Sequence, residues 1–336
     1  MKSIRRRKLA WRAVAWLVAL ALLAVVLQRT PLGQSAAILR RLSLLEILTL
    51  VLLNAIVLLV LALRWRIVVH GLGGNAGWFW LAAYRLAGFA VSYFTPGTQF
   101  GGEPLQVYLL HRRHTWPAGL AAASVTIDKA LELLGNFTFL LLGLLVSLSL
   151  RLISRELAPP LLLAACALLG LPVVFLAAMA AGIQPLSWLL QRSFLRQTSV
   201  VQRVLPAVAT MEEAIQSLFR RKPETLVLAM GASLLSWVLQ IAEAWVLLRF
   251  LDLRLGLAET IGVITAGRLA LLVPVPAGLG ALEVSQVLAF DALGTPPGSG
   301  LAFVAVVRAR DLLLGACGLA LGASLAPGWR ETDRVT

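Results

Sequence analysis

The stretch FTPGTQFGGEPLQVYLL, residues 94–110, places three glycines, two prolines and one carboxylate in a chain dominated by Leu, Ala and Val. Gly101 and Gly102 allow a sharp turn, and Pro104 has the fixed φ that suits the first turn of a new helix. Glu103 stands where a helix N-terminus favours negative charge. The stretch therefore predicts a break in the chain, followed by a short helix that opens on a glutamate.

The composition around this stretch is that of a multi-pass membrane protein. Of the 336 residues, 59% are hydrophobic and 14% are charged, and the mean hydropathy is +0.86, so the chain has more apolar surface than a soluble core can bury. The net charge of +14 comes from arginines that cluster at the ends of apolar runs, which indicates membrane topology rather than a nucleic-acid partner. Cys166 and Cys317 lie in separate apolar runs, and we expect them to be inert core thiols.

Membrane spans are predicted from apolar runs of about 20 residues. These runs lie at residues 10–28, 44–64, 133–150, 160–182, 224–248 and 301–325. We interpret the first as a retained transmembrane helix, because no small-residue cleavage site follows it. The basic residues at positions 5–8 place the N-terminus in the cytoplasm, and Arg64 with Arg66 mark the cytoplasmic end of the second span.

A polar, arginine-rich segment, residues 183–223, separates the spans into two groups and is predicted to be cytoplasmic. Its apolar residues recur at helical spacing, which predicts an amphipathic helix that lies on the membrane surface. We interpret the segment as a linker between two halves of the chain, with a partner-binding site as the alternative.

Two further apolar regions, residues 78–110 and 258–293, are each interrupted by Gly and Pro. In each region a proline precedes a glutamate, Glu103 or Glu283, by seven residues. Irregular backbone at membrane depth survives only where protein buries it or water fills a cavity, so the two breaks predict a cavity. The break residues are Pro96, Gly97, Gly101, Gly102, Pro104, Pro276, Gly278 and Gly280.

The spacing of charged residues indicates an internal repeat. Arg85 precedes Asp128 by 43 residues, and Arg268 precedes Asp311 by the same 43. If each break is a re-entrant hairpin, counting crossings from a cytoplasmic N-terminus makes the halves inverted copies. The predicted fold class is an all-α integral membrane protein, a polytopic helical bundle with two inverted repeats. The predicted units are one membrane domain, residues 1–336, with repeat 1 at residues 44–150 and repeat 2 at residues 224–325.

The spans and breaks carry many ionisable residues, each of which costs roughly 2.5 to 3.5 kcal/mol at the bilayer centre. One interpretation is structural, with glutamates neutralised by neighbouring arginines. The other is a binding site, in which arginines attract a phosphate while carboxylates accept an amine headgroup or carry a proton. The candidate substrate-binding residues are Arg85, Glu103, Asp128, Lys129, Arg268, Glu283, Arg308, Arg310 and Asp311. The equal spacing predicts that Arg85 pairs with Asp128 and that Arg268 pairs with Asp311.

Four motifs together are similar to a known family. They are GGEP at 101–104, DKALELLG at 128–135, PAGLGALE at 276–283 and RARDLL at 308–313. As a set they resemble the transmembrane region of lysylphosphatidylglycerol synthases, which also occurs alone in flippase-like proteins. The resemblance covers about residues 10–325 and implies a role in moving lipids between leaflets. Lys129 and Gln106 depart from the family, which often has arginine near these positions, and the change at Gln106 removes a possible headgroup contact.

We therefore expect a flippase or transporter for a polar-headed lipid in the inner (cytoplasmic) membrane of the cell. The expected partners are membrane lipids, either an anionic or aminoacylated phospholipid or a polyprenyl-linked lipid, and the chain is a candidate homo-oligomer. The alternative is a non-transporting scaffold or regulator of envelope-lipid or glycan synthesis. Enzyme activity is not expected, because the synthases carry their catalyst in a separate soluble domain and this chain ends at Thr336. Neither a metal nor a cofactor is expected, since the HRRH run at 111–114 has no further ligand nearby and no phosphate-binding loop motif occurs.

Overall fold

A computed structural model describes residues 42–94, 101–193, 198–273, 278–296 and 298–325. Within these ranges the chain forms eleven α-helices and no strand, which confirms the predicted all-α class. The predicted first transmembrane helix, residues 10–28, lies outside the described residues, as do Pro96, Gly97 and Pro276.

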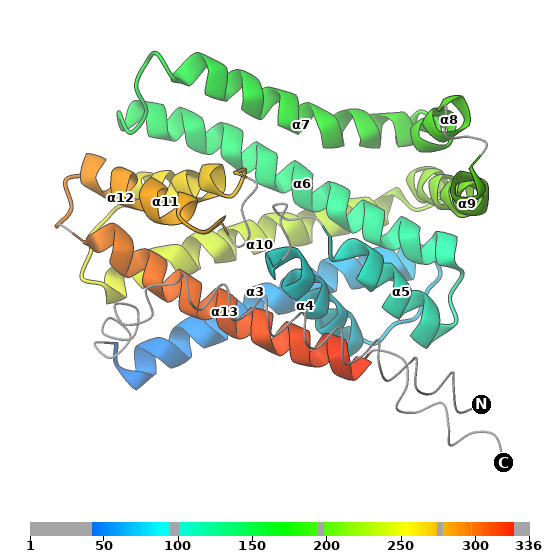
Figure 1. Ribbon diagram of the computed structural model, residues 1–336, viewed down its shortest axis with the longest axis horizontal. Helices are drawn as coiled ribbons and strands as arrows, with labels where there is room; N and C mark the ends of the chain where they lie inside the picture. Colours follow the sequence, from blue (N-terminus) through cyan, green and yellow to red (C-terminus); the bar gives the residue numbers. More distant parts are fainter. Residues whose placement is uncertain (1–41, 95–100, 194–197, 274–277, 297, 326–336) are drawn as a thin grey trace.

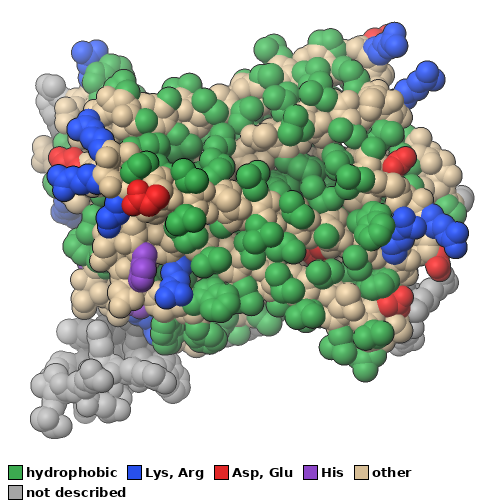
Figure 2. Space-filling model, turned by 180° about the vertical axis from the view of Figure 1, so that it is seen from behind, with side chains coloured by type: hydrophobic (Ala, Val, Ile, Leu, Met, Phe, Trp, Pro, Cys, Tyr) green, Lys and Arg blue, Asp and Glu red, His purple; other side chains and the backbone are tan. Residues whose placement is uncertain are grey.

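Long helices packed side by side form the body of the molecule (Figure 1). They are α3 (Leu44–Gly71), α6 (Ala118–Ser149), α7 (Ala158–Ala180), α10 (Pro223–Phe250) and α13 (Ser299–Leu325). By length and composition, all of these except α13 qualify as membrane spans among the described residues. Figure 2 shows apolar side chains over the middle of one face and charged side chains gathered at its two ends, the distribution expected of a protein that crosses a bilayer.

The two interrupted regions each fold as a pair of short helices. The first pair is α4 (Trp78–Phe94) and α5 (Glu103–His114), and the second is α11 (Leu257–Ala270) and α12 (Ala281–Ala292). The sequence therefore located both breaks correctly. In Figure 1, α5 lies toward the end of the molecule that carries α8 and α9, whereas α11 and α12 lie toward the opposite end.

The helix order repeats across the two halves of the chain. Helices α3 to α6 contain 28, 17, 12 and 32 residues, and helices α10 to α13 contain 28, 14, 12 and 27. The contacts between halves are reciprocal, because α3 packs on α10, α4 on α13, and α6 on α11. A two-fold relation between the halves would produce this pairing. The inverted orientation and the re-entrant character of the hairpins stay predictions.

Small residues bring the halves close together at the two reciprocal crossings. A Cβ atom at Gly318 of α13 would collide with the carbonyl oxygen of Leu86 in α4. At the other crossing, a Cβ atom at Gly143 of α6 would collide with the hydroxyl of Thr265 in α11. In a bilayer the hydrophobic effect does little to drive helices together, so helix association depends on close packing. Glycine permits that close approach.

The linker differs from its prediction. It folds as α8 (Pro185–Arg192) and α9 (Ser199–Arg221), so its helical character is confirmed. However, Met211, Ile215 and Leu218 on the apolar face of α9 are buried in a core cluster with residues of α3, α6, α7 and α10. The prediction that this face rests on the membrane surface is therefore wrong, because the face packs on protein instead.

Two other predictions are also corrected. Helix α6 begins at Ala118, well before the predicted start at residue 133. The polar residues of its first turns lower the hydropathy of this stretch, so the search for apolar runs left it out. These residues nevertheless have partners inside the bundle. Cys166 and Cys317 are exposed rather than buried in the core. Both cysteines lie on long apolar helices, whose outward faces are as apolar as their inward faces.

Candidate functional site

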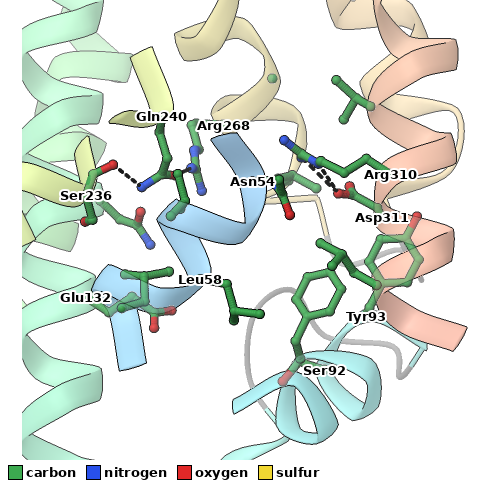
Figure 3. A pocket seen from close by; sticks show the side chains of 18 of the residues that line it. Asn54, Leu58, Ser92, Tyr93, Glu132, Ser236, Gln240, Arg268, Arg310 and Asp311 are labelled. Atoms are coloured by element: carbon green, nitrogen blue, oxygen red, sulfur yellow. Dashed lines mark hydrogen bonds and ion pairs between the residues drawn. The ribbon is translucent and has the colours of Figure 1, made fainter. Parts of the chain in front are cut away.

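A cavity of about 450 Å³ lies between the two halves, and all four helices of each half contribute to its walls. Figure 3 shows side chains from both halves around this space, among them Asn54, Glu132, Gln240, Arg268 and Arg310. Eight of the nine candidate residues line it, namely Arg85, Glu103, Asp128, Lys129, Arg268, Arg308, Arg310 and Asp311. Two break residues, Gly102 and Gly278, also line it, so the breaks and the charges belong to one site.

Asp128 is the centre of the charged cluster in the first half. Its Oδ1 lies 2.7 Å from Arg64 Nε, and its Oδ2 lies 2.5 Å from Arg85 Nη1. All three residues are buried, with Arg64 only 2% exposed. The predicted pairing of Arg85 with Asp128 is confirmed. Arg64 also donates from Nη1 to Ser233 Oγ at 3.2 Å, which links the cluster to α10.

Lys129 extends this cluster toward the break. Its Nζ lies 3.0 Å from Glu103 Oε1 and 2.9 Å from Glu132 Oε1, so it joins α5 to α6. Glu132 Oε2 also lies 3.1 Å from Arg85 Nη2. The three cations and three carboxylates of the cluster therefore form a continuous chain of ion pairs, in which each charge has an opposite charge beside it.

The second half holds a different cluster. Arg310 Nη1 lies 2.8 Å from Glu243 Oε1, and Arg310 Nη2 lies 2.9 Å from Asp311 Oδ1. Arg268 instead donates from Nη2 to Gln240 Oε1 at 2.8 Å. The predicted pairing of Arg268 with Asp311 is therefore wrong. The neighbouring Arg310 holds Asp311 with both Nε and Nη2, which leaves this carboxylate committed to the adjacent residue.

The two break glutamates open their helices in the same way. Glu103 Oε2 accepts the Gly101 N–H at 2.8 Å, and Glu283 Oε2 accepts the Gly280 N–H at 2.8 Å. Both glutamates thus fold back on the glycine-rich loop, as the sequence predicted for a carboxylate at a helix N-terminus. Glu283 pairs with Arg308, whose Nε lies 3.0 Å from its Oε1, but Glu283 itself does not line the cavity.

The list of candidate residues omitted several polar side chains that line the site, among them Asn54, Arg64, Glu132, Gln240 and Glu243. That the C-terminal end of this span is cytoplasmic stays a prediction, but Arg64 does not end the helix, because α3 continues through Trp65, Val68 and Val69 to Gly71. Those apolar residues beyond Arg64 were the available signal. Asn54 donates from Nδ2 to Glu243 Oε1 at 3.3 Å, a contact between helices far apart in sequence that no local pattern indicates.

Every ion pair among the described residues lies within one half. Six pairs join residues of α3 to α6, and three join residues of α10 to α13. Contacts from these clusters to the other half go through hydrogen-bonding groups such as Ser233, Asn54 and Tyr93. The two clusters therefore face one cavity as separately neutralised units.

The histidines of the HRRH run have partners outside the cavity. His111 Nδ1 lies 2.6 Å from the Trp116 carbonyl oxygen, and His114 Nε2 lies 3.2 Å from the Tyr84 hydroxyl. Among the described residues there is no group of three His, Cys, Asp or Glu side chains arranged to hold a metal ion. The cavity itself is lined by guanidinium, ammonium, carboxylate and amide groups.

The family model described as the lysylphosphatidylglycerol synthase TM region matches residues 12–318. The chain belongs to this family. It is 26% identical over 301 residues to a UPF0104 membrane protein of Methanothermobacter thermautotrophicus, covering 86% of this chain and 87% of that protein. It is 21% identical over 274 residues to the UPF0104 membrane protein MJ1595 of Methanocaldococcus jannaschii, covering 78% and 79%. No solved structure matches significantly. The chain is thus a membrane protein, and all the residues that line the cavity lie within the matched region.

Proposed function

We propose that this protein moves a polar-headed lipid between the leaflets of the membrane. The observation that carries the proposal is a cavity between the halves of a membrane bundle, lined by guanidinium, ammonium and carboxylate groups. A polar headgroup crosses hydrocarbon at prohibitive cost, because its charges and hydrogen-bonding groups lose water without replacement. Side chains of both signs can replace that water, while the acyl chains stay in lipid.

The arrangement of the ion pairs supports movement between the halves. Because each pair joins residues of the same half, the halves can tilt against each other without separating any of the described pairs. The cross-half polar contacts at the cavity, from Arg64 to Ser233, from Asn54 to Glu243 and from Arg308 to Tyr93, are single hydrogen bonds. Tilting of one half against the other around a central site is the motion by which repeat-built transporters alternate access.

We propose in addition an inner-membrane location with the N-terminus in the cytoplasm. The last turns of α5, α8 and α9 concentrate basic residues at one end of the molecule (Figure 1). They are Arg112, Arg113, Arg192, Arg220 and Arg221. Basic loops favour the cytoplasmic side, so this end is assigned to the cytoplasm. The protein acts in this proposal as a carrier rather than an enzyme.

Fluorescent-lipid translocation in proteoliposomes tests the proposal, with two adjacent leucines as a matched pair. Leu58 lines the cavity, and Leu59 is an exposed apolar residue at 38% exposure. Leu58→Trp should obstruct the cavity and abolish translocation, whereas Leu59→Trp should translocate like the parent. Equal translocation by both variants would mean that the lipid headgroup does not pass through the cavity. Absence of translocation by the parent would favour the scaffold alternative.

A further inference from the structure

Among the described residues, Arg268 is the cation lining the cavity that contacts no carboxylate. Its guanidinium lies within ion-pair distance of no carboxylate among the residues that the structure describes. Of the 16 acidic residues in the chain, only Glu331 and Asp333 fall outside that part. Arg64, Arg85, Arg308 and Arg310 each contact at least one carboxylate. The guanidinium of Arg268 thus faces the cavity without a carboxylate of the described chain in contact with it.

Arg85, the equivalent residue of the first half, does contact carboxylates. Arg85 contacts Asp128 and also Glu132, which lies 47 residues further along the chain. At the same separation after Arg268 the chain has Gly315, which has no side chain to offer. Asp311, the counterpart of Asp128, is held by Arg310. Arg85 therefore has two carboxylate partners. At the equivalent positions of the second half, one carboxylate is replaced by Gly315 and the other, Asp311, is held by Arg310.

Arg268 is nevertheless held in a fixed position. Its guanidinium carbon lies 5.1 Å from the centre of the Trp237 ring, and Trp237 stacks on Phe139 with ring centres 4.3 Å apart. Gln240 accepts one N–H, at 2.8 Å from Nη2. A guanidinium carries five N–H donors in a rigid plane, so this anchoring orients the group without satisfying it. In Figure 3 the guanidinium groups of Arg268 and Arg310 lie at the edge of the same space.

We infer that Arg268 binds the phosphate of the transported lipid's headgroup. The inference rests on the proposed function and narrows it, because the other arginines of the cavity are already engaged by the protein's own carboxylates. A planar guanidinium matches a phosphate with two parallel N–H···O bonds, and such charge-assisted bonds are stronger than neutral ones. The ligand is thus a lipid phosphate that accepts the N–H donors that Arg268 has left, as Asp128 and Glu132 accept those of Arg85.

Thermal stability separates this role from a structural one. Arg85→Gln removes a cation from a buried network and should lower the melting temperature of the detergent-purified protein clearly. Arg268→Gln removes a cation that no carboxylate of the described chain contacts, so it should melt at or above the parent temperature. The control is Arg249→Gln, since Arg249 also stacks on a tryptophan of α10, Trp245, but lies on the surface. Melting of Arg268→Gln as far below the parent as Arg85→Gln would overturn the inference.

Binding supplies the second measurement. The probe is dihexanoylphosphatidylglycerol, titrated against the same purified proteins, with dihexanoylglycerol as the ligand that lacks a phosphate. The parent and Arg249→Gln should bind the phospholipid alike, and Arg268→Gln should bind it at least about tenfold more weakly, as expected for a lost charge-assisted contact. Arg268→Lys should fall between, because lysine keeps the charge but loses the planar fork. Unchanged binding by Arg268→Gln, or equal binding of dihexanoylglycerol by the parent, would overturn the assignment.

Inorganic phosphate distinguishes a lipid ligand from a free anion. It should bind far more weakly than the phospholipid, because it lacks the acyl chains. Equally strong, Arg268-dependent binding of inorganic phosphate would replace the lipid assignment with a free-anion site. Translocation by the same preparations keeps the two proposals apart. If binding depends on Arg268 but the parent does not translocate lipid, the phosphate site stands and the transporter is rejected. If Arg268→Gln translocates lipid as well as the parent does, the transporter stands and the phosphate site is rejected.

Discussion

Arg64 of α3 donates its Nε–H to Asp128 of α6 at 2.7 Å, and both side chains are almost completely buried. The same carboxylate receives Arg85 from α4, so one aspartate joins three helices of the first half. Ion pairs of this kind are costly to break by removing one partner, because the other is left as an uncompensated buried charge. The cluster therefore serves the fold as well as the cavity it lines.

Arg64→Gln should destabilise the protein by about 3 to 5 kcal/mol, the usual cost of breaking a buried pair. Asp128→Asn added to it should recover part of the loss, since Arg85 and Lys129 are then again balanced by Glu103 and Glu132. Arg66→Gln is the control, because Arg66 lies two residues away and takes part in none of the ion pairs of the cluster. Chemical unfolding of the parent, the two single variants Arg64→Gln and Asp128→Asn and the double variant in detergent measures the cycle, and simple additivity would mean that the two residues do not interact.

The break glutamates should respond differently to the same substitution. Sequence reasoning predicts that Glu103→Gln and Glu283→Gln both keep the fold and lose transport. In the structure, Glu103 lines the cavity and its partner Lys129 retains Glu132, whereas Glu283 pairs with Arg308, which is 2% exposed.

Glu103→Gln should therefore melt close to the parent and lose lipid translocation. Glu283→Gln should lower the melting temperature, because it removes a carboxylate from a buried arginine. Both quantities are measured on the same purified preparations. Full translocation by Glu103→Gln would mean that Glu103 serves only as a helix cap.

The glycine contacts between halves give a third prediction. Gly318→Ala introduces a Cβ where the Leu86 carbonyl oxygen stands, so it should destabilise the protein by about 1 to 3 kcal/mol through overpacking. Gly231→Ala is the matched control, since a Cβ there meets nothing within 4 Å and alanine favours the helix by up to about 1 kcal/mol. A melting temperature for Gly318→Ala at or above that of Gly231→Ala would contradict the close crossing of α4 and α13.

Membrane topology is tested with two isosteric substitutions, Ser154→Cys and Ser217→Cys. Both serines are exposed, one between α6 and α7 and the other on α9. Cys166 and Cys317 are replaced by serine first, because both are exposed and would react with a thiol reagent themselves. An impermeant maleimide added to intact cells should label Ser154→Cys and spare Ser217→Cys. The opposite pattern would reverse the proposed orientation.

Composition and periodicity were sufficient for the helical class and for both breaks, because apolar runs and Gly-Pro interruptions are local signals. The recurring 43-residue spacing predicted the pairing of Arg85 with Asp128 correctly, but the same spacing predicted a wrong partner for Arg268. The second pair could not be predicted, because whether Arg268 or Arg310 takes Asp311 depends on Glu243 from another helix. Charged residues in membrane bundles pair with residues of other helices, and the separation of two residues in the sequence does not determine which helices are in contact.

The confinement of each charge cluster to its own half has a consequence for how the protein is made. The N-terminal half leaves the ribosome first, and the three cations and three carboxylates of its cavity cluster already have opposite charges among themselves. This cluster can therefore leave the insertion machinery electrically balanced while the rest of the chain is still being synthesised. A nascent chain that depended on α10 or α13 for neutralisation would have to hold bare charges in the bilayer during that interval. The division of ion pairs thus matches the order in which translation delivers the helices.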